Sequence, residues 1–167
     1  MAKAVFLDRD ETLNSDPGYI NEPDLFSLFP WVGLELARLK ANGFKLILVS
    51  NQSGIGRGMI TWDQLSAIHA KLAHELMAQA NIAIDQIKIC PHHPDESCDC
   101  RKPKPKMILE SIQELGLDPQ HCFMIGDRKS DFEAGVNAGL KKSFLIIPGD
   151  EDSFRQTVTE ILKIESN

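Results

Sequence analysis

Two carboxylates separated by a single residue follow a short apolar run near the start of the chain. The run Val5-Phe6-Leu7 is too short for anything but a buried strand, and Asp8 and Asp10 come directly after it. In an open parallel sheet, ligands bind outside the carboxyl ends of the strands, so this position would place both acids where such folds carry their chemistry. The alternative is that the two acids simply begin a solvated loop and cap a turn.

Further polar side chains follow two other apolar runs. Ser50 and Asn51 end the second run, and Asp127 and Asp131 follow the fourth. Lys102 precedes an expected helix and can reach the same edge of a sheet. If the acids converge, they repel one another unless a cation neutralises them, and oxygen ligands favour a hard divalent ion such as Mg²⁺. The sequence therefore predicts a magnesium site at this edge.

These groups together could transfer a phosphoryl group. With the negative charges screened by the metal, a phosphate could approach Asp8, whose carboxylate could attack phosphorus. Lys102 and the Ser50 hydroxyl would hold the equatorial oxygens in the transition state. Asp10 could protonate the leaving alcohol and then deprotonate the attacking water. The expected reaction is hydrolysis of a phosphate ester through an aspartyl-phosphate intermediate.

A second set of metal-binding residue types lies between residues 90 and 100. It has the ligand types and number of a closed, four-coordinate structural zinc site, formed by Cys90, His92, Cys98 and Cys100. The proline, serine and acidic residues between them cannot build a packed element, so a metal would hold this loop in shape. Free cysteines and a solvated histidine are the alternative. Because four protein ligands leave no open position, we expect structural rather than catalytic zinc.

Strand and helix patterns alternate along the whole chain. Strands are expected at 5–7, 44–49, 84–90, 122–125 and 144–147, and helices at 31–42, after the Thr61/Gln64 capping-box pair, at 107–115, up to Ala138 and at about 153–164. A long Pro- and Gly-rich connection fills 14–30. This alternation predicts an α/β domain with a mainly parallel sheet. We expect residues 1–167 to form a single domain, without room for a large inserted cap.

The composition of the chain limits the classes of binding partner that it can have. The net charge of −6 argues against a nucleic-acid partner, which usually needs a basic surface. Apolar runs stay shorter than a membrane span, and Met1-Ala2-Lys3 leads into the first strand without a signal-peptide pattern. We therefore expect a cytoplasmic protein that acts on a small molecule and has no membrane partner.

Other polar residues are interpreted as structural. His69 and His74 fall on an expected helix and are assigned to its surface or its packing. Cys122 lies in an apolar run and is expected in the core. The glycines between 54 and 58 predict a flexible loop, which lacks the ending of a P-loop.

Four motifs, in order, resemble those of the haloacid dehalogenase (HAD) superfamily of aspartate-dependent phosphatases. They are Asp8-Arg9-Asp10-Glu11-Thr12, Ser50-Asn51, Lys102 and Gly126-Asp127-Arg128-Lys129-Ser130-Asp131. The resemblance implies a Rossmann-like three-layer domain in which Asp8, the backbone carbonyl of Asp10 and Asp127 hold Mg²⁺, with Asp131 in support. Two other classes of function stay open at this point, a phosphoacceptor signalling domain and a catalytically silent zinc-stabilised binding module. Asp10 argues against the first, because a stable phospho-switch has no use for a general acid.

A narrower resemblance is to the heptose bisphosphate phosphatases of this superfamily and to their relatives, the histidinol-phosphate phosphatases. It rests on Gly18-Tyr19, the stretch 51–58 and the Cys/His segments 90–94 and 98–103. It implies that the substrate contacts Asp16, Gly18, Tyr19, Asn51, Gln52, Ser53, Arg101 and Arg128. We expect a monomeric enzyme of lipopolysaccharide-type heptose synthesis that removes the 7-phosphate of a heptose 1,7-bisphosphate, with histidinol phosphate as the alternative substrate. The chain departs from the family pattern at Glu11, where glycine is usual, and at Lys106 and Arg128.

Overall fold

The computed structural model describes residues 2–166, so the two ends of the expected domain, residues 1 and 167, lie outside it. Within this range, five strands form one sheet in the order β3-β2-β1-β4-β5, and every pairing is parallel. The strands are β1 (Ala2–Leu7), β2 (Phe44–Asn51), β3 (Gln86–Cys90), β4 (Leu117–Gly126) and β5 (Lys142–Leu145). The expected α/β fold with a parallel sheet is confirmed.

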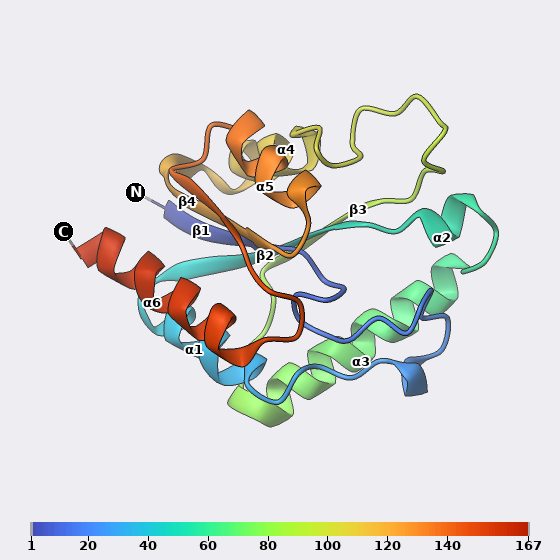
Figure 1. The fold of residues 1–167 in the computed structure, drawn as a ribbon, viewed down its shortest axis with the longest axis horizontal. Helices are drawn as coiled ribbons and strands as arrows, with labels where there is room; N and C mark the ends of the chain where they lie inside the picture. The colour runs from blue at the N-terminus through green and yellow to red at the C-terminus, as the bar shows by residue number, and fades with distance from the viewer. Residues whose placement is uncertain (1, 167) are drawn as a thin grey trace.

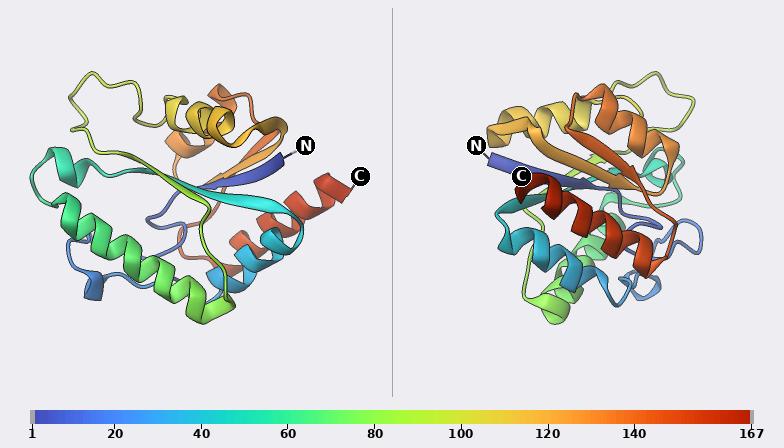
Figure 2. Two further views of the ribbon diagram at one scale, coloured as in Figure 1. Left: turned by 180° about the vertical axis from the view of Figure 1, so that it is seen from behind. Right: turned by 60° about the vertical axis from the view of Figure 1, so that its left-hand side comes forward.

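Helices cover both faces of this sheet, as Figures 1 and 2 show. One face carries α1 (Val32–Ala41), α3 (Trp62–Ala80) and α6 (Glu151–Ser166), and the other carries α4 (Lys106–Leu115) and α5 (Lys129–Asn137). Alternate residues of β1 point to opposite layers, with Val5 in the core beneath α1, α3 and α6 and Phe6 in the core beneath α4 and α5. This arrangement confirms the three-layer architecture.

Several local predictions hold and others need correction. Thr61 and Gln64 form the expected capping box at the start of α3, and Cys122 is fully buried. β4 begins at Leu117, five residues before the expected start, because an irregularity in its pairing with β1 accommodates the polar residues that follow. β5 lies two residues earlier than expected, and the predicted flexible loop begins with one helical turn, α2 (Ser53–Gly56).

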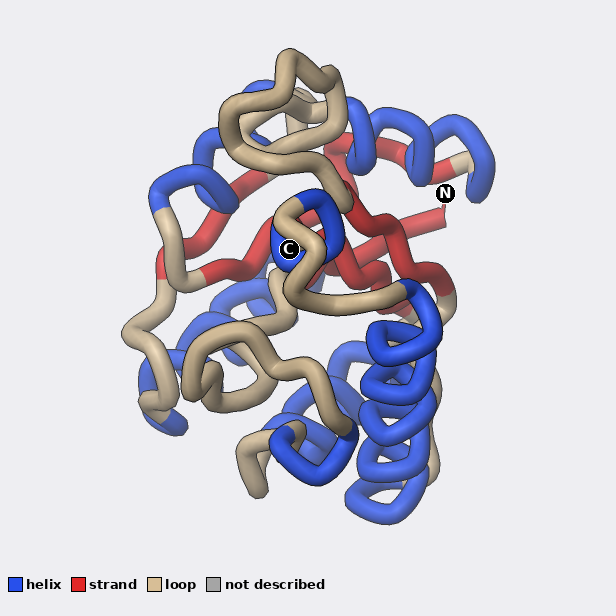
Figure 3. Tube along the Cα trace, turned by 90° about the vertical axis from the view of Figure 1, so that its right-hand side faces the viewer, coloured by secondary structure: helices blue, strands red, loops and turns tan. Residues whose placement is uncertain are grey.

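The long connection 14–30 packs against the body of the domain. It contains one turn of 3₁₀ helix, η1 (Pro23–Leu25), and its apolar side chains Ile20, Phe26 and Leu28 are buried in the core under α1 and α3. Figure 3 looks onto the end of the molecule where this connection and the other loops lie. Among the described residues, none forms a helix that is both long and apolar enough to cross a membrane.

Candidate active site

The acids that follow β1 and β4 lie close together at the carboxyl edge of the sheet. β1 pairs with β4 on one side and with β2 on the other, so the segments after these three strands are neighbours. Carboxylate oxygens of Asp8, Asp127 and Asp131 all lie within 4.8 Å of one another. Asp131 reaches the group from the first turn of α5. Side chains separated by more than 100 positions in the chain therefore form one acidic cluster.

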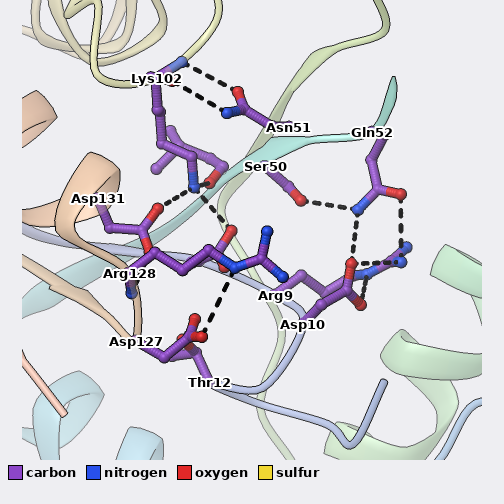
Figure 4. A network of polar contacts seen from close by, with 12 residues as sticks. Arg9, Asp10, Thr12, Ser50, Asn51, Gln52, Lys102, Asp127, Arg128 and Asp131 are labelled. Carbon is purple, nitrogen blue, oxygen red and sulfur yellow. Dashed lines mark hydrogen bonds and ion pairs between the residues drawn. The ribbon is translucent and has the colours of Figure 1, made fainter. Parts of the chain in front are cut away.

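Lys102 is the cation at the centre of this cluster. Its Nζ lies 2.7 Å from Asp8 Oδ1 and 2.6 Å from Asp131 Oδ1, and it donates to the Val49 carbonyl at 2.7 Å (Figure 4). The side chain is only 2% exposed. The Asn51 side chain fixes the backbone of Lys102, because it accepts from the Lys102 N–H at 3.0 Å and donates to the Lys102 carbonyl at 3.2 Å.

Burial strongly perturbs the charges of this group. Burial raises the pKa of Asp8 to about 7, although Lys102 acts in the opposite direction. Burial and the charge of Asp131 also raise the pKa of Asp127. Burial acts to lower the pKa of Lys102, but Asp8 and Asp131 hold it above its ordinary value, so the ammonium stays charged at neutral pH.

These residues fit a hard divalent cation. Three carboxylates face one ammonium group, which leaves an excess of negative charge in a mostly buried place. Oxygen donors of this kind are the ligands that Mg²⁺ prefers. Asp131 already accepts from Lys102 and from the Arg128 N–H at 3.0 Å, whereas Asp127 accepts from the Thr12 hydroxyl at 3.2 Å and its Oδ2 lies 3.8 Å from Arg128 Nε. Asp8 and Asp127 therefore have the freer carboxylate oxygens.

The Asp10 side chain points away from the acidic cluster into a second network. Its Oδ1 accepts from Arg9 Nε at 2.8 Å and from Asn14 Nδ2 at 3.1 Å, and its Oδ2 accepts from Arg9 Nη2 and Gln52 Nε2, both at 3.0 Å. Gln52 Nε2 also donates to Ser50 Oγ at 2.8 Å (Figure 4), and Ser50 lines the same cavity as Asp8 and Asp131. Although burial acts to raise the pKa of Asp10, the charge and hydrogen bonds of Arg9 hold it below its usual range.

Two residues of this network were not predicted. Arg9 is 1% exposed and Asn14 is 0% exposed, so both are built into the interior although their types usually lie at the surface. The only sequence signal for Arg9 is its place between two acids. Asn14 gives no signal, because its contact with Asp10 depends on the tight turn over residues 10–14.

Two adjoining cavities open beside these groups. One of about 260 Å³ and one of about 210 Å³ share Asp10, Asn51, Ser53 and Arg128 in their walls. Every residue expected to contact the substrate lines one or both cavities: Asp16, Gly18, Tyr19, Asn51, Gln52, Ser53, Arg101 and Arg128. Within the described part of the chain, Arg101 Nη1 is buried and has no hydrogen-bond partner.

Glu11 occupies the position where the family pattern has glycine. Its φ of 61° lies in the left-handed region, which glycine adopts without strain and other residues rarely adopt. The Glu11 carboxylate accepts from the Asp16 N–H at 2.6 Å, so this departure adds a contact to the loop that lines the larger cavity.

The predicted zinc ligands also converge. Cys90 Sγ lies 3.7 Å from Cys98 Sγ and 3.0 Å from Cys100 Sγ, and His92 Nδ1 lies 3.5 Å from Cys90 Sγ and 3.2 Å from Cys100 Sγ. In a tetrahedral site with Zn–S bonds of about 2.3 Å, two sulfurs lie about 3.8 Å apart. All four cysteines of the chain are free, which leaves these thiols available to a metal. The donor set and its spacing fit Zn²⁺.

The loop that carries the Cys/His cluster packs against the cavity walls. Gly56 N donates to the Pro91 carbonyl at 2.8 Å, and Gln52 N donates to the Cys90 carbonyl at 2.8 Å. A Cβ at Gly56 would lie 2.5 Å from the His93 nitrogen, so only glycine allows this approach. The same loop ends at Arg101 and Lys102. Its conformation therefore controls several groups that line the cavities.

Comparisons with known proteins match this arrangement. A family model described as HAD-hydrolase-like matches residues 99–150. The chain is 44% identical over 155 residues to the D-glycero-beta-D-manno-heptose-1,7-bisphosphate 7-phosphatase of Pasteurella multocida (strain Pm70), which covers 89% of this chain and 84% of that protein. It is 39% identical over 153 residues to the protein of the same name from Escherichia coli (strain K12), with 87% and 80% covered.

A solved structure resembles the chain over nearly its whole length. It is the D,D-heptose 1,7-bisphosphate phosphatase from B. bronchiseptica complexed with magnesium and phosphate, with a TM-score of 0.87 and 30% identity over 97% of this chain and 99% of that one. A putative HAD-like phosphatase from Mesorhizobium loti gives a TM-score of 0.88 at 28% identity, over 98% and 87%.

Proposed function

We propose that this chain, which belongs to the heptose bisphosphate phosphatase family of the HAD-like hydrolases, removes the 7-phosphate from D-glycero-D-manno-heptose 1,7-bisphosphate. Like the other members of its family, the chain is a phosphoric monoester hydrolase that depends on Mg²⁺. The observation that carries the proposal is the buried Asp8 beside Lys102 and Asp127, which provides an acceptor, a phosphate-binding cation and a metal ligand within one cluster.

In the first step, Asp8 is the nucleophile that receives the phosphoryl group. Its Oδ1 is oriented by Lys102, which is also placed to neutralise charge on the transferring phosphoryl oxygens. The Ser50 hydroxyl opens on the smaller cavity and offers a hydrogen bond to the same group. Asp8, Asp127 and the Asp10 backbone carbonyl, supported by Asp131, would hold Mg²⁺, which would supply the positive charge that lets a phosphate approach a carboxylate.

In both steps, Asp10 acts as the general acid and base. It lies in the wall shared by the two cavities, between Asp8 and the sugar-binding side. It protonates the leaving alkoxide when the aspartyl phosphate forms, and it then takes a proton from the water that hydrolyses this intermediate. The Arg9, Asn14 and Gln52 side chains orient its carboxylate between these events.

The remaining cavity residues recognise the substrate. The unpaired Arg101 Nη1, at the smaller cavity, and the exposed Arg128, at both cavities, offer positive charge to an anionic sugar, while Asp16, Gly18 and Tyr19 line the larger cavity with Arg128. Asn51, Gln52 and Ser53 complete the wall. Zn²⁺ bound by Cys90, His92, Cys98 and Cys100 would keep the loop that carries Arg101 and Lys102 in place. We further propose that residues 1–167 act as one domain, as a cytoplasmic monomer in heptose synthesis.

A substrate panel tests the proposal. Phosphate release is measured with Mg²⁺ on both anomers of the heptose 1,7-bisphosphate, on hexose phosphates and on histidinol phosphate, and the readout is the ratio of kcat/KM values. We expect a heptose bisphosphate to be preferred. A preference of more than about tenfold for histidinol phosphate, or about 1.4 kcal/mol, would instead support the alternative substrate.

The variant Asp8→Asn tests the nucleophile in the same assay. We expect phosphate release to fall to background because an amide cannot accept the phosphoryl group, while zinc content and folding persist. Unchanged turnover in this variant would remove Asp8 from the mechanism.

A further inference from the structure

Behind the general acid and base lie two buried nitrogen atoms that the mechanism above does not use. Among the described residues, Arg9 Nη1 and His69 Nε2 are both buried and have no hydrogen-bond partner. A buried polar group without a partner is unusual in a folded protein and calls for an explanation. Every other nitrogen of the Arg9 guanidinium is engaged, with Nε on Asp10 Oδ1 and Nη2 on both Asp10 Oδ2 and Gln52 Oε1.

His69 comes from α3, one of the three helices that cover the sheet face carrying α1 and α6. It lies at the edge of the buried stripe of this helix, next to Ile68 and one turn after Leu65. Burial and the positive charge of Arg9 lower the pKa of His69 to about 4, while Asp10 acts in the opposite direction. The ring is therefore neutral at neutral pH, and it feels the charges of both Arg9 and Asp10.

The two unpartnered atoms are chemically complementary. A neutral imidazole has one nitrogen that donates and one that accepts a hydrogen bond, whereas a guanidinium nitrogen only donates. The structure has no direct hydrogen bond between them, but with Nε2 as the acceptor, one buried water that accepts from Arg9 Nη1 and donates to His69 Nε2 satisfies both atoms at once. His69 would then bind the third nitrogen of the Arg9 guanidinium, whose other two nitrogens bind Asp10.

We propose that His69 is a positioning residue for the reaction, which orients Asp10 by fixing the guanidinium of Arg9. This inference rests on the proposed function, since it concerns the step in which Asp10 protonates the leaving group. His69 itself touches neither the substrate nor the reacting atoms. Without His69, the Arg9 guanidinium is held less firmly and the Asp10 carboxylate is misaligned. The acidic cluster around Asp8 keeps its contacts with Lys102.

The test compares two substrates that differ in their need for an acid. A sugar phosphate leaves as a poor alkoxide and requires protonation, whereas acetyl phosphate leaves as acetate and does not. Acetyl phosphate carries the phosphoryl group that Asp8 and Lys102 handle, so the wild type hydrolyses it at a high enough enzyme concentration. The variants are His69→Leu, His69→Gln and, as a matched control on the exposed side of the same helix, His74→Leu.

We expect His69→Leu to lose about tenfold in kcat/KM on the heptose bisphosphate, a fraction of the ~100-fold or more that general acid catalysis contributes. The same variant should keep its kcat/KM on acetyl phosphate within about twofold, because kcat/KM reports the steps up to release of acetate and not the later water attack that Asp10 assists. The Gln side chain places an oxygen near the position of Nε2, so His69→Gln should recover most of the loss, and His74→Leu should match the wild type in both assays. His69→Phe replaces the leucine variant if the latter does not fold.

Three results would overturn the inference: no loss in His69→Leu, an equal loss on both substrates, or no recovery in His69→Gln. Wild-type protein that releases no phosphate from any sugar phosphate would instead refute the proposed function. The two failures are therefore distinguishable.

Discussion

Replacing Lys102 by methionine should destabilise the protein more than the loss of an ordinary surface charge. The Lys102 ammonium contacts Asp8, Asp131 and the Val49 carbonyl within 2.7 Å, and the side chain is 2% exposed. Methionine fills a similar volume but removes this donor from two buried carboxylates and a carbonyl, and Asp131 keeps only its bond from the Arg128 N–H. Breaking a buried ion pair from one side typically costs 3–5 kcal/mol, so we expect a loss of about 4 kcal/mol in the free energy of unfolding.

The assay is urea unfolding at pH 7 in magnesium-free buffer, with Lys106→Met as the control for an exposed lysine in the same segment. For a chain of this size, the expected loss lowers Tm by about 12 °C. The double variant Asp8→Asn/Lys102→Met should be more stable than additivity predicts, by about 2 kcal/mol, because only one uncompensated carboxylate then remains. Saturating Mg²⁺ should return part of the stability, about 3 kcal/mol at 100 times its Kd. A loss below about 1 kcal/mol in Lys102→Met would refute the reasoning that this ammonium holds the acids together.

Two further predictions follow from the metal sites. The Cys98→Ala variant should bind less zinc in elemental analysis, and its Tm should fall by more than about 5 °C together with its activity. His93 lies outside the cluster, so His93→Ala should keep its zinc. Full zinc occupancy in Cys98→Ala would contradict this assignment. The second prediction concerns pH. Burial raises the pKa of Asp8 from 3.8 to about 7 in the folded state. The protonated Asp8 carboxyl therefore stabilises the fold fully when the pH is below the pKa of the unfolded state, and this stabilisation is lost as the pH rises towards 7. In magnesium-free buffer, the wild type should therefore lose about 2 kcal/mol between pH 5 and 7 relative to Asp8→Asn, and a difference that stays flat with pH would contradict the shift.

The sequence was most informative where strand ends decide the geometry. A parallel sheet brings the residues after β1, β2 and β4 to one edge whatever lies between them, so the meeting of Asp8 and Asp127 could be predicted from apolar runs alone. The zinc-type cluster was equally accessible, because its residue types and their spacing are rare outside metal sites. The start of β4 was not accessible, since residues 118–121 are polar or proline and the register with β1 is irregular there.

Side-chain directions could not be derived from the sequence. Asp10 follows Asp8 by two residues, yet its carboxylate turns towards Arg9 and Gln52, because the tight turn over residues 10–14 redirects it. A residue 43 positions away provides one partner of Arg9, and no local pattern announces such a contact. His69 was assigned to the surface or the packing of its helix for the same reason. Its neighbourhood with Arg9 depends on how α3 docks, which periodicity does not specify.

The pair of hydrogen bonds between the Asn51 amide and the backbone of Lys102 has a consequence for how this enzyme can vary. The amide imitates an adjacent strand, so it ties the peptide of the lysine to the end of β2 in addition to the support that the Cys/His loop provides. The segment between His92 and Cys98 should therefore tolerate exchange for segments of other lengths. Such exchanges would reshape the sugar pocket without moving the Lys102 ammonium away from Asp8.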